Sequence, residues 1–176
     1  MSKTVTEIQK ELADREAIRD CLFRYCRGID RIDVDLLYDV YWPGAIDDHL
    51  LFKGPAEGFI EFTVPLLQEM EQTMHKLGNI LIQIQGEATA GVETYFDAYH
   101  KLKEENGRRR DQVVGGRYLD RFEKRNDRWK IADRLVVLDW FRLYDDSGDW
   151  ASQPLGMQVM PGGRKPDDRS YGYLRG

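Results

Sequence analysis

The amino-acid sequence places a histidine, His75, where its hydrophobic periodicity changes. Apolar residues recur every three or four positions before His75 and every second position after Gly78, which predicts a helix followed by a strand. An imidazole at such a junction would lie where helices meet the edge of a sheet, and imidazole transfers protons near neutral pH. His75 is therefore a candidate catalytic base. The alternative is a capping or packing histidine at a helix end.

Three further side chains could contribute to a site. Arg134 shares a predicted strand face with Val136 and Leu138, and a buried guanidinium needs a partner. It either serves a pocket or pairs with a carboxylate at the end of the sheet. Tyr25 lies on the apolar stripe of a predicted helix, where core packing is the alternative to a catalytic role. Asp30 follows near the end of this helix, and composition alone favours a capping or turn carboxylate.

Helices are predicted for the first half of the chain. Apolar residues form a single stripe from Thr4 to Ile29, which indicates an amphipathic helix that ends or loosens at Gly28. Asp33 is placed to cap a second helix. A third helix is expected over 55–74, and Pro65 within it predicts a kink or a split.

The second half of the chain alternates apolar and polar residues, as strands do. A helical half followed by an antiparallel meander predicts an α+β fold. We expect one domain over 1–144 and an irregular tail over 145–176, rich in Asp, Gly, Pro and Ser. His100 is expected to be exposed at a strand end. The four predicted strands cover 80–85, 89–102, 112–124 and 129–141.

Composition restricts the function classes. The 176 residues are 41% hydrophobic and 32% charged, with a net charge of -5, which argues against nucleic-acid and anionic-membrane partners. No apolar run is long enough to span a membrane, and the N-terminus lacks the apolar stretch of a signal peptide. Cys21 and Cys26 would point to different faces of one helix, so we expect no disulfide and a reducing cytoplasm. Asp47, Asp48 and His49 are adjacent rather than spaced as metal ligands, so no metal site is expected there.

Several of these residues form a pattern that resembles a known family. Tyr25 precedes Asp30 by five positions, and His75 begins a His-x-x-Gly-Asn segment. A Val-Gly-Gly-Arg-Tyr segment starts at Val114, and Trp129-Lys130 follows a turn. Over 4–142 the chain resembles the SnoaL-like branch of the nuclear-transport-factor-like superfamily. This branch includes bile-acid dehydratase, hexachlorocyclohexane dehydrochlorinase and, further off, scytalone dehydratase.

The resemblance implies a fold and a chemistry. The fold would be a cone-shaped α+β barrel, a curved and mostly antiparallel sheet with N-terminal helices on its concave face and a central cavity. Asp30 and His75 match the aspartate and histidine of an Asp–His dyad, while Tyr25 and Arg134 match a tyrosine and an arginine of these enzymes. The expected substrate pocket contains Tyr95, Val114, Gly116, Val136 and Leu138.

The implied activity is a cofactor-independent, dehydratase-type elimination on a small hydrophobic cyclic substrate, without a metal. The alternatives are an isomerase or cyclase that uses the same base on a steroid or polyketide, and a non-catalytic small-molecule-binding or structural subunit. The expected partners are a small hydrophobic molecule and further copies of the chain in a dimer or trimer, with no nucleic acid and no membrane.

Overall fold

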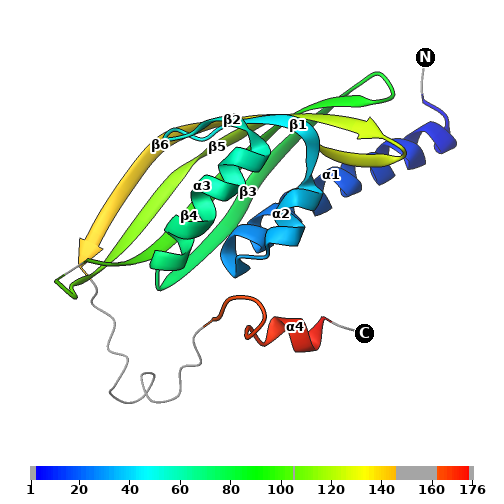
Figure 1. The fold of residues 1–176 in the computed structure, drawn as a ribbon. Coiled ribbons are helices and arrows are strands. Elements are labelled where there is room, and N and C mark those ends of the chain that lie inside the picture. Colours follow the sequence, from blue (N-terminus) through cyan, green and yellow to red (C-terminus); the bar gives the residue numbers. More distant parts are fainter. Residues whose placement is uncertain (1–2, 105, 146–161, 175–176) are drawn as a thin grey trace.

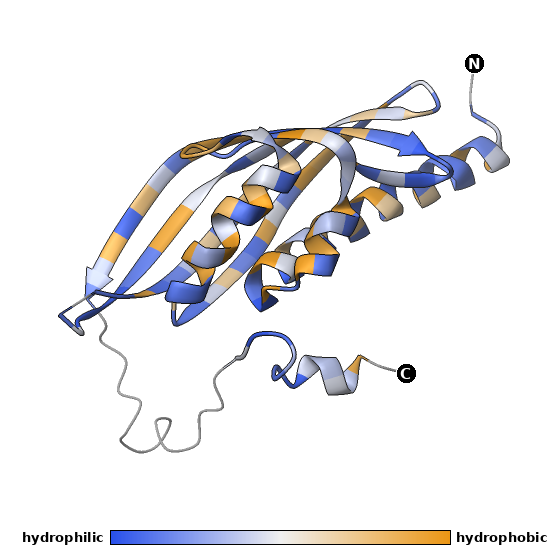
Figure 2. Cartoon of the chain, viewed as in Figure 1, coloured by the Kyte–Doolittle hydropathy of each residue, from blue (hydrophilic) through white to orange (hydrophobic). Residues whose placement is uncertain are grey.

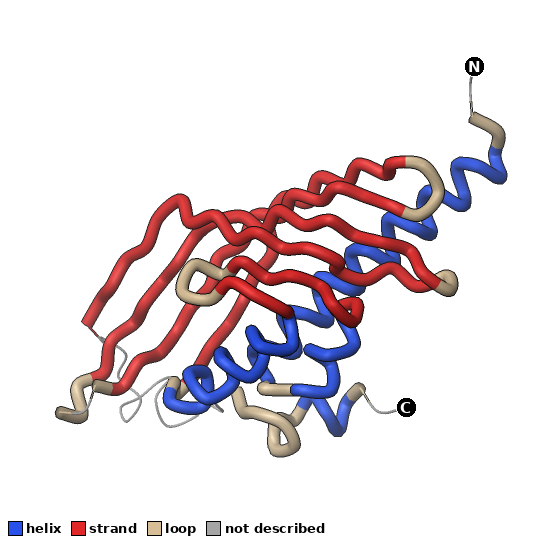
Figure 3. Tube along the Cα trace, turned by 45° about the horizontal axis from the view of Figure 1, so that its top comes forward, coloured by secondary structure: helices blue, strands red, loops and turns tan. Residues whose placement is uncertain are grey.

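The computed structural model describes residues 3–104, 106–145 and 162–174, and it shows helices on one side of a curved sheet (Figures 1 and 3). The six-stranded sheet has the order β2-β1-β6-β5-β4-β3. Only the β1–β6 pair is parallel, so the predicted α+β fold with a mostly antiparallel sheet is confirmed. The elements are α1 (Val5–Arg31), α2 (Val34–Val40), β1 (Tyr41–Asp48), β2 (Lys53–Pro55), α3 (Ala56–Glu69), β3 (Gln72–Gln85), β4 (Thr89–Lys103), β5 (Arg109–Arg125), β6 (Arg128–Asp145) and α4 (Ser170–Tyr173).

Helix α1 continues through the glycine at which we expected it to end. A capping box between Thr4 and Glu7 starts the helix, and Ile32 ends it in the left-handed region at φ 51°. Gly28 lies inside the last turns, where a Cβ atom would come 2.6 Å from Cδ2 of Leu37. Gly28 therefore permits close approach of α1 and α2, which is a packing role that sequence alone did not indicate.

Helix α3 is shorter than predicted and it is not split. Pro65 lies within a helix that runs continuously over Ala56–Glu69, so of the two predicted alternatives, a kink or a split, the split is excluded. The next residues leave the helix, and β3 begins at Gln72 because this segment pairs with β4 from Gln72 opposite Lys101 onward. His75 consequently lies in the edge strand β3 and not at a helix end.

Strands β1 and β2 were missed in the sequence. β1 is interrupted by Pro43 and Gly44 and ends in two aspartates, so it lacks the alternation that marks a strand. Its pairing with β6 starts at Tyr41 opposite Ile131, and these two residues are far apart in the sequence. Since this register is long-range, no local pattern could have revealed it.

Buried residues recur at alternate positions along much of β4, β5 and β6, and hydrophobic and hydrophilic residues alternate along the strands (Figure 2). The buried set faces the helices. Phe96 of β4 and Tyr118 of β5 stack on this face with ring centroids 4.3 Å apart. The β5–β6 register shifts between Gly115 and Gly116, and such a bulge bends the sheet. At Gly116 a Cβ atom would lie 2.2 Å from the Val137 carbonyl oxygen, so the bend requires glycine at this position.

The described part of the C-terminal segment packs against the end of α1. Arg31 donates to the Gly163 carbonyl at 2.8 Å, and Asp33 accepts from Lys165 at 2.7 Å and from Tyr171 at 2.8 Å. The expected tail over 145–176 includes 146–161, which lie outside the described residues. The division at residue 144 stays a prediction. Among the described helices, none has the length and apolar character needed to cross a membrane.

Candidate active site

Asp30 and His75 form a hydrogen-bonded pair although they are 45 residues apart. Asp30 Oδ1 lies 2.8 Å from His75 Nδ1, and Asp30 Oδ2 accepts the backbone N–H of His75 at 2.8 Å. Both side chains are less than one-tenth exposed. Burial raises the pKa of Asp30, but the hydrogen bonds from His75 outweigh it and hold this pKa below its ordinary value. An ionised Asp30 accepts from Nδ1–H, so Nε2 of His75 is the ring nitrogen that can act as a base.

His100 lies beside this pair, which corrects the expectation that it is exposed. Its ring meets the His75 ring edge-on, with centroids 5.5 Å apart. Burial, with a smaller effect of nearby His75, lowers the pKa of His100 to about 4. His100 is therefore neutral near pH 7 and does not compete with His75 for a proton.

His75 opens into a cavity of about 280 Å³ between α3 and the concave face of the sheet. His75 and Tyr25 both line it, and so do three of the five residues predicted for the substrate pocket: Val114, Val136 and Leu138. The remaining lining is mainly aliphatic and aromatic, as is usual for small-molecule sites. It comprises Ile29, His49, Leu50, Leu51, Phe59, Phe62, Thr63, Leu66, Leu67, Met70, Phe96, Ala98, His100, Gln112 and Tyr118.

Tyr95 and Gly116 do not line the cavity, contrary to expectation. Tyr95 occupies the opposite parity of β4 from Phe96 and is 45% exposed, because successive strand residues alternate between faces. There it lies under Arg117 of β5, whose guanidinium carbon is 5.9 Å from the ring centroid. Gly116 is enclosed by the sheet bend described above.

Arg134 is fully buried behind the cavity wall and does not line the cavity. Its Nε and Nη2 atoms each donate to one carboxylate oxygen of Asp120 at 2.7 Å. The guanidinium carbon also lies 4.1 Å from the ring centroid of Tyr25 and 4.2 Å from that of Tyr118. The sequence left open whether Arg134 serves a pocket or pairs with a carboxylate, and its contacts are those of a carboxylate pair. Arg134 contacts the cavity wall only through the two tyrosines.

Tyr25 connects the arginine to the cavity. Its ring meets Tyr41 and Tyr118 edge-on, at centroid distances of 6.1 and 5.6 Å. Burial raises the pKa of Tyr25, while the positive charge of Arg134 opposes this. The phenol therefore keeps its proton and is available as a hydrogen-bond donor to a ligand in the cavity.

Two functional candidates were missed in the sequence. His49 lines the cavity and its Nδ1 lies 3.1 Å from Asp47 Oδ1, and both residues were considered in the sequence only as metal ligands. Arg164 donates to the Asp30 carbonyl at 2.6 Å and to Thr73 Oγ1 at 2.7 Å, from the C-terminal segment for which no role was predicted. Arg164 thus supports the backbone that carries the carboxylate of the dyad.

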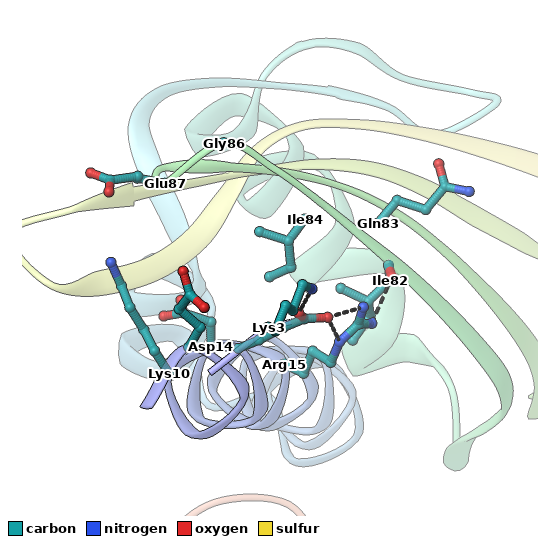
Figure 4. Close-up of a pocket in the computed structure, with 11 residues that line it drawn as sticks. Lys3, Lys10, Asp14, Arg15, Ile82, Gln83, Ile84, Gly86 and Glu87 are labelled. Atoms are coloured by element: carbon teal, nitrogen blue, oxygen red, sulfur yellow. Dashed lines mark hydrogen bonds and ion pairs between the residues drawn. The ribbon is translucent and has the colours of Figure 1, made fainter. Parts of the chain in front are cut away.

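A second hollow lies between the start of α1 and the β3–β4 turn (Figure 4). It measures about 470 Å³ and is lined by charged residues of both signs. Arg15 crosses it to donate to the Ile82 carbonyl at 2.7 Å. None of the predicted site residues lies there, so the smaller apolar cavity remains the candidate site.

Metal-ligating residues do not converge in groups of three or more within residues 3–104, 106–145 and 162–174. Asp47 instead accepts from Tyr41 and contacts His49, while Asp48 pairs with Lys53 at 2.7 Å. The adjacent acidic residues therefore point to different partners.

Comparison with known proteins identifies relatives of the fold. Residues 10–135 match the sequence model of the SnoaL-like domain. Hexachlorocyclohexane dehydrochlorinase LinA type 2 aligns with a TM-score of 0.70 and 18% identity, over 78% of this chain and 93% of its own. A protein of Novosphingobium aromaticivorans provisionally assigned as a scytalone dehydratase gives 0.68 and 20%, over 81% and 98%. LinA type 3 of Novosphingobium barchaimii gives 0.62 and 18%, over 77% and 92%. A search of curated protein sequences finds no match.

Proposed function

The chain belongs to the SnoaL-like family, and we propose that it is a cofactor-independent lyase that eliminates water or another leaving group from a small hydrophobic cyclic substrate. The observation that carries this proposal is the Asp30–His75 pair, in which both carboxylate oxygens bind one histidine that lines an apolar cavity. The second ring nitrogen of this histidine has no hydrogen-bond partner among the described residues. Solved structures named as a dehydrochlorinase and a dehydratase share the fold, and both names denote eliminations.

The chemistry follows from the proposed protonation states. Neutral His75 takes a proton from a carbon next to a carbonyl or a leaving group, and Asp30 stabilises the imidazolium that forms. Tyr25 donates to the oxygen on which negative charge develops. Arg134 acts from behind the wall by holding Tyr25 and Tyr118 in place. The low polarity of the cavity strengthens each of these interactions.

Cavity size limits the substrate. About 280 Å³ lies near the lower end of the range for small-molecule sites, roughly 300–1,000 Å³. This favours a compact ring compound over a steroid. A ring flanked by Phe59, Phe62 and Phe96 would be held by apolar contacts, while the few polar groups orient its reactive end.

Isomerisation is the second candidate, and the shielding of His75 favours it. The His75 side chain is only 9% exposed, so part of the protons taken by its ring would return to carbon before they exchange with solvent. Such a proton can return to a second carbon of the same intermediate, as an isomerase or cyclase requires.

A substrate panel tests the proposal. Small cyclic β-hydroxy ketones and hydroxylated steroids are incubated with the wild type and with His75→Ala, and products are identified by ultraviolet absorption and mass. Enone formation by elimination in the wild type, lost in His75→Ala, supports a lyase. Conversion to an isomer of unchanged mass supports the second candidate.

A matched pair of carboxylate variants controls for indirect effects. Asp30→Asn removes the charge that supports His75, whereas Asp97→Asn makes the same change at an exposed position of β4. Product formation that survives Asp30→Asn and His75→Ala would contradict the role of the dyad, whereas no turnover by the wild type across the panel would favour a binding or structural subunit.

We further propose a homo-oligomer, a dimer or trimer, in the cytoplasm. Support for self-association comes from the convex face of the sheet, where Leu81, Glu93, Leu119 and Leu135 lie in one row across β3–β6. Leu81 is 55% and Leu135 is 41% exposed. A second copy packed on this face would bury them. Sedimentation of the wild type and of Leu81→Lys tests this proposal.

A further inference from the structure

A second Asp–His pair faces the same cavity. His49 Nδ1 lies 3.1 Å from Asp47 Oδ1, and Asp47 Oδ2 accepts from the Tyr41 hydroxyl at 2.6 Å. Asp47 has no exposed surface. Both oxygens of the Asp47 carboxylate have partners, as in Asp30. Of the two ring nitrogens of His49, only Nδ1 makes a hydrogen bond in the described part of the chain. Nε2 of His49 is therefore available to a ligand.

His49 and His75 come from opposite edges of the sheet. His49 follows β1, next to one edge, and His75 lies in β3, the other edge strand. The ring of His49 stacks on Phe59 of α3, with centroids 4.5 Å apart and planes 19° from parallel, and this stack fixes its orientation. Both histidines line the one cavity, so a small ring compound would lie between two imidazoles.

The buried charges around the two histidines differ. Near His49 lie two carboxylates, Asp47 and Asp120, and one guanidinium, that of Arg134. Burial raises the pKa of Asp120 while the charge of Arg134 opposes this. With both carboxylates ionised the three groups carry a net charge of -1, and all are at most 5% exposed. Uncompensated charge is costly in such a place. A proton on His49 neutralises the group.

Around His75 the charges already balance. The negative charge of Asp30 is offset by the guanidinium of Arg164, which is bound to the Asp30 carbonyl at 2.6 Å. The charge of Arg31 beside Arg164 is offset by Asp168 at 3.7 Å. Neighbouring His100 is neutral at pH 7. A neutral His75 leaves this group uncharged, which is the state that a base needs.

We infer that His49 is the general acid that protonates the leaving group. The inference rests on the proposed lyase function. Nε2 of His75 takes the proton from the α-carbon. The electron pair of the broken carbon–hydrogen bond forms the carbon–carbon double bond, and the β-carbon–oxygen bond breaks. The departing hydroxide takes the Nε2 proton of His49 and leaves as water. His75 then carries one proton more and His49 one fewer, and solvent restores both states after product release.

Two substrates with one carbon skeleton test this role. A cyclic β-hydroxy ketone needs an acid because hydroxide is a poor leaving group, whereas the corresponding β-(4-nitrophenoxy) ketone releases a stable anion. The measured quantity is the ratio of the two kcat/KM values. We expect His49→Gln to lower this ratio roughly 100-fold or more, within the usual contribution of general acid catalysis. His75→Gln should slow both reactions and leave the ratio unchanged.

The outcomes separate the two claims. A ratio that His49→Gln leaves unchanged would overturn the acid role while the lyase function stands. Rates that His75→Gln leaves unchanged would overturn the lyase function itself. Asp47→Asn removes one negative charge beside His49 and should lower the ratio in the same direction.

Nitrogen-15 NMR of the histidine rings gives a readout that does not depend on turnover. His49→Gln assigns the signals. We expect both ring nitrogens of His49 to be protonated at neutral pH, while His75 carries a proton on Nδ1 alone. A singly protonated His49 in the free protein would overturn the inference.

Discussion

Replacing Asp120 with alanine tests whether Arg134 is part of a closed internal ion pair. The substitution removes both hydrogen bonds of 2.7 Å to a guanidinium that has no exposed surface. Arg134 would then be buried between Tyr25 and Tyr118 without its hydrogen-bonded carboxylate. Breaking such a pair costs about 3–5 kcal/mol of folding free energy.

The size of this loss can be measured by two methods. For a chain of this length, 1 kcal/mol corresponds to a change of about 2–4 °C in Tm, so Asp120→Ala should lower Tm by roughly 6–20 °C. Urea denaturation followed by circular dichroism gives the free energy directly. The double variant Asp120→Leu with Arg134→Met replaces the pair by apolar groups and should recover most of the loss, since buried ion pairs add little net stability over such groups.

A small effect would refute this reasoning. If Asp120→Ala cost less than about 1 kcal/mol, the pair would behave as an exposed salt bridge, and Arg134 would have to reach solvent or the cavity. Failure of the double variant to regain stability would show that packing around Tyr25, and not the unpaired charge, accounts for the loss.

Three further predictions concern other parts of the chain. Arg164→Gln removes support from the dyad backbone and should lower kcat about tenfold to a hundredfold, with Arg169→Gln as the control. Hydrogen bonds from within 162–174 lower the pKa of Asp168 to about 2. Ionised Asp168 therefore stabilises this segment fully above its ordinary pKa near 4, and the stabilisation is lost as the pH falls toward 2. The protection of 162–174 against hydrogen exchange should therefore decrease as the pH falls over that range, and Asp168→Asn should remove this pH dependence. Gly28→Val forces its Cβ against Leu37 and should cost about 1–3 kcal/mol in urea denaturation.

Sequence patterns predicted three of the four long strands and the first two helices well because each carries a strong local period, whereas β3 was predicted only from residue 80 although it starts at Gln72. They failed where pairing partners are distant. β1 is held by β6, and its sequence gives no alternation, so neither the strand nor His49, which follows it, was found.

The candidate site shows the same division. Asp30 and His75 were identified by resemblance, and the structure places their side chains 2.8 Å apart. The position of Arg134 on a buried strand face was read from alternation, but its partner Asp120 depends on the β5–β6 register, which pairs the two residues directly. Tyr95 was assigned to the wrong face, because spacing within a strand does not say which face is concave.

Proton exchange at carbon tests the central claim, that His75 is a base facing the cavity, without requiring the true substrate. Compact cyclic ketones are incubated with the protein in D₂O, and loss of the α-proton signal is followed by NMR. We predict saturable exchange with the wild type, reduced about 100-fold or more in His75→Gln and in Asp30→Asn. Exchange at the same rate in His75→Gln, or none above buffer with any ketone that binds, would contradict the account.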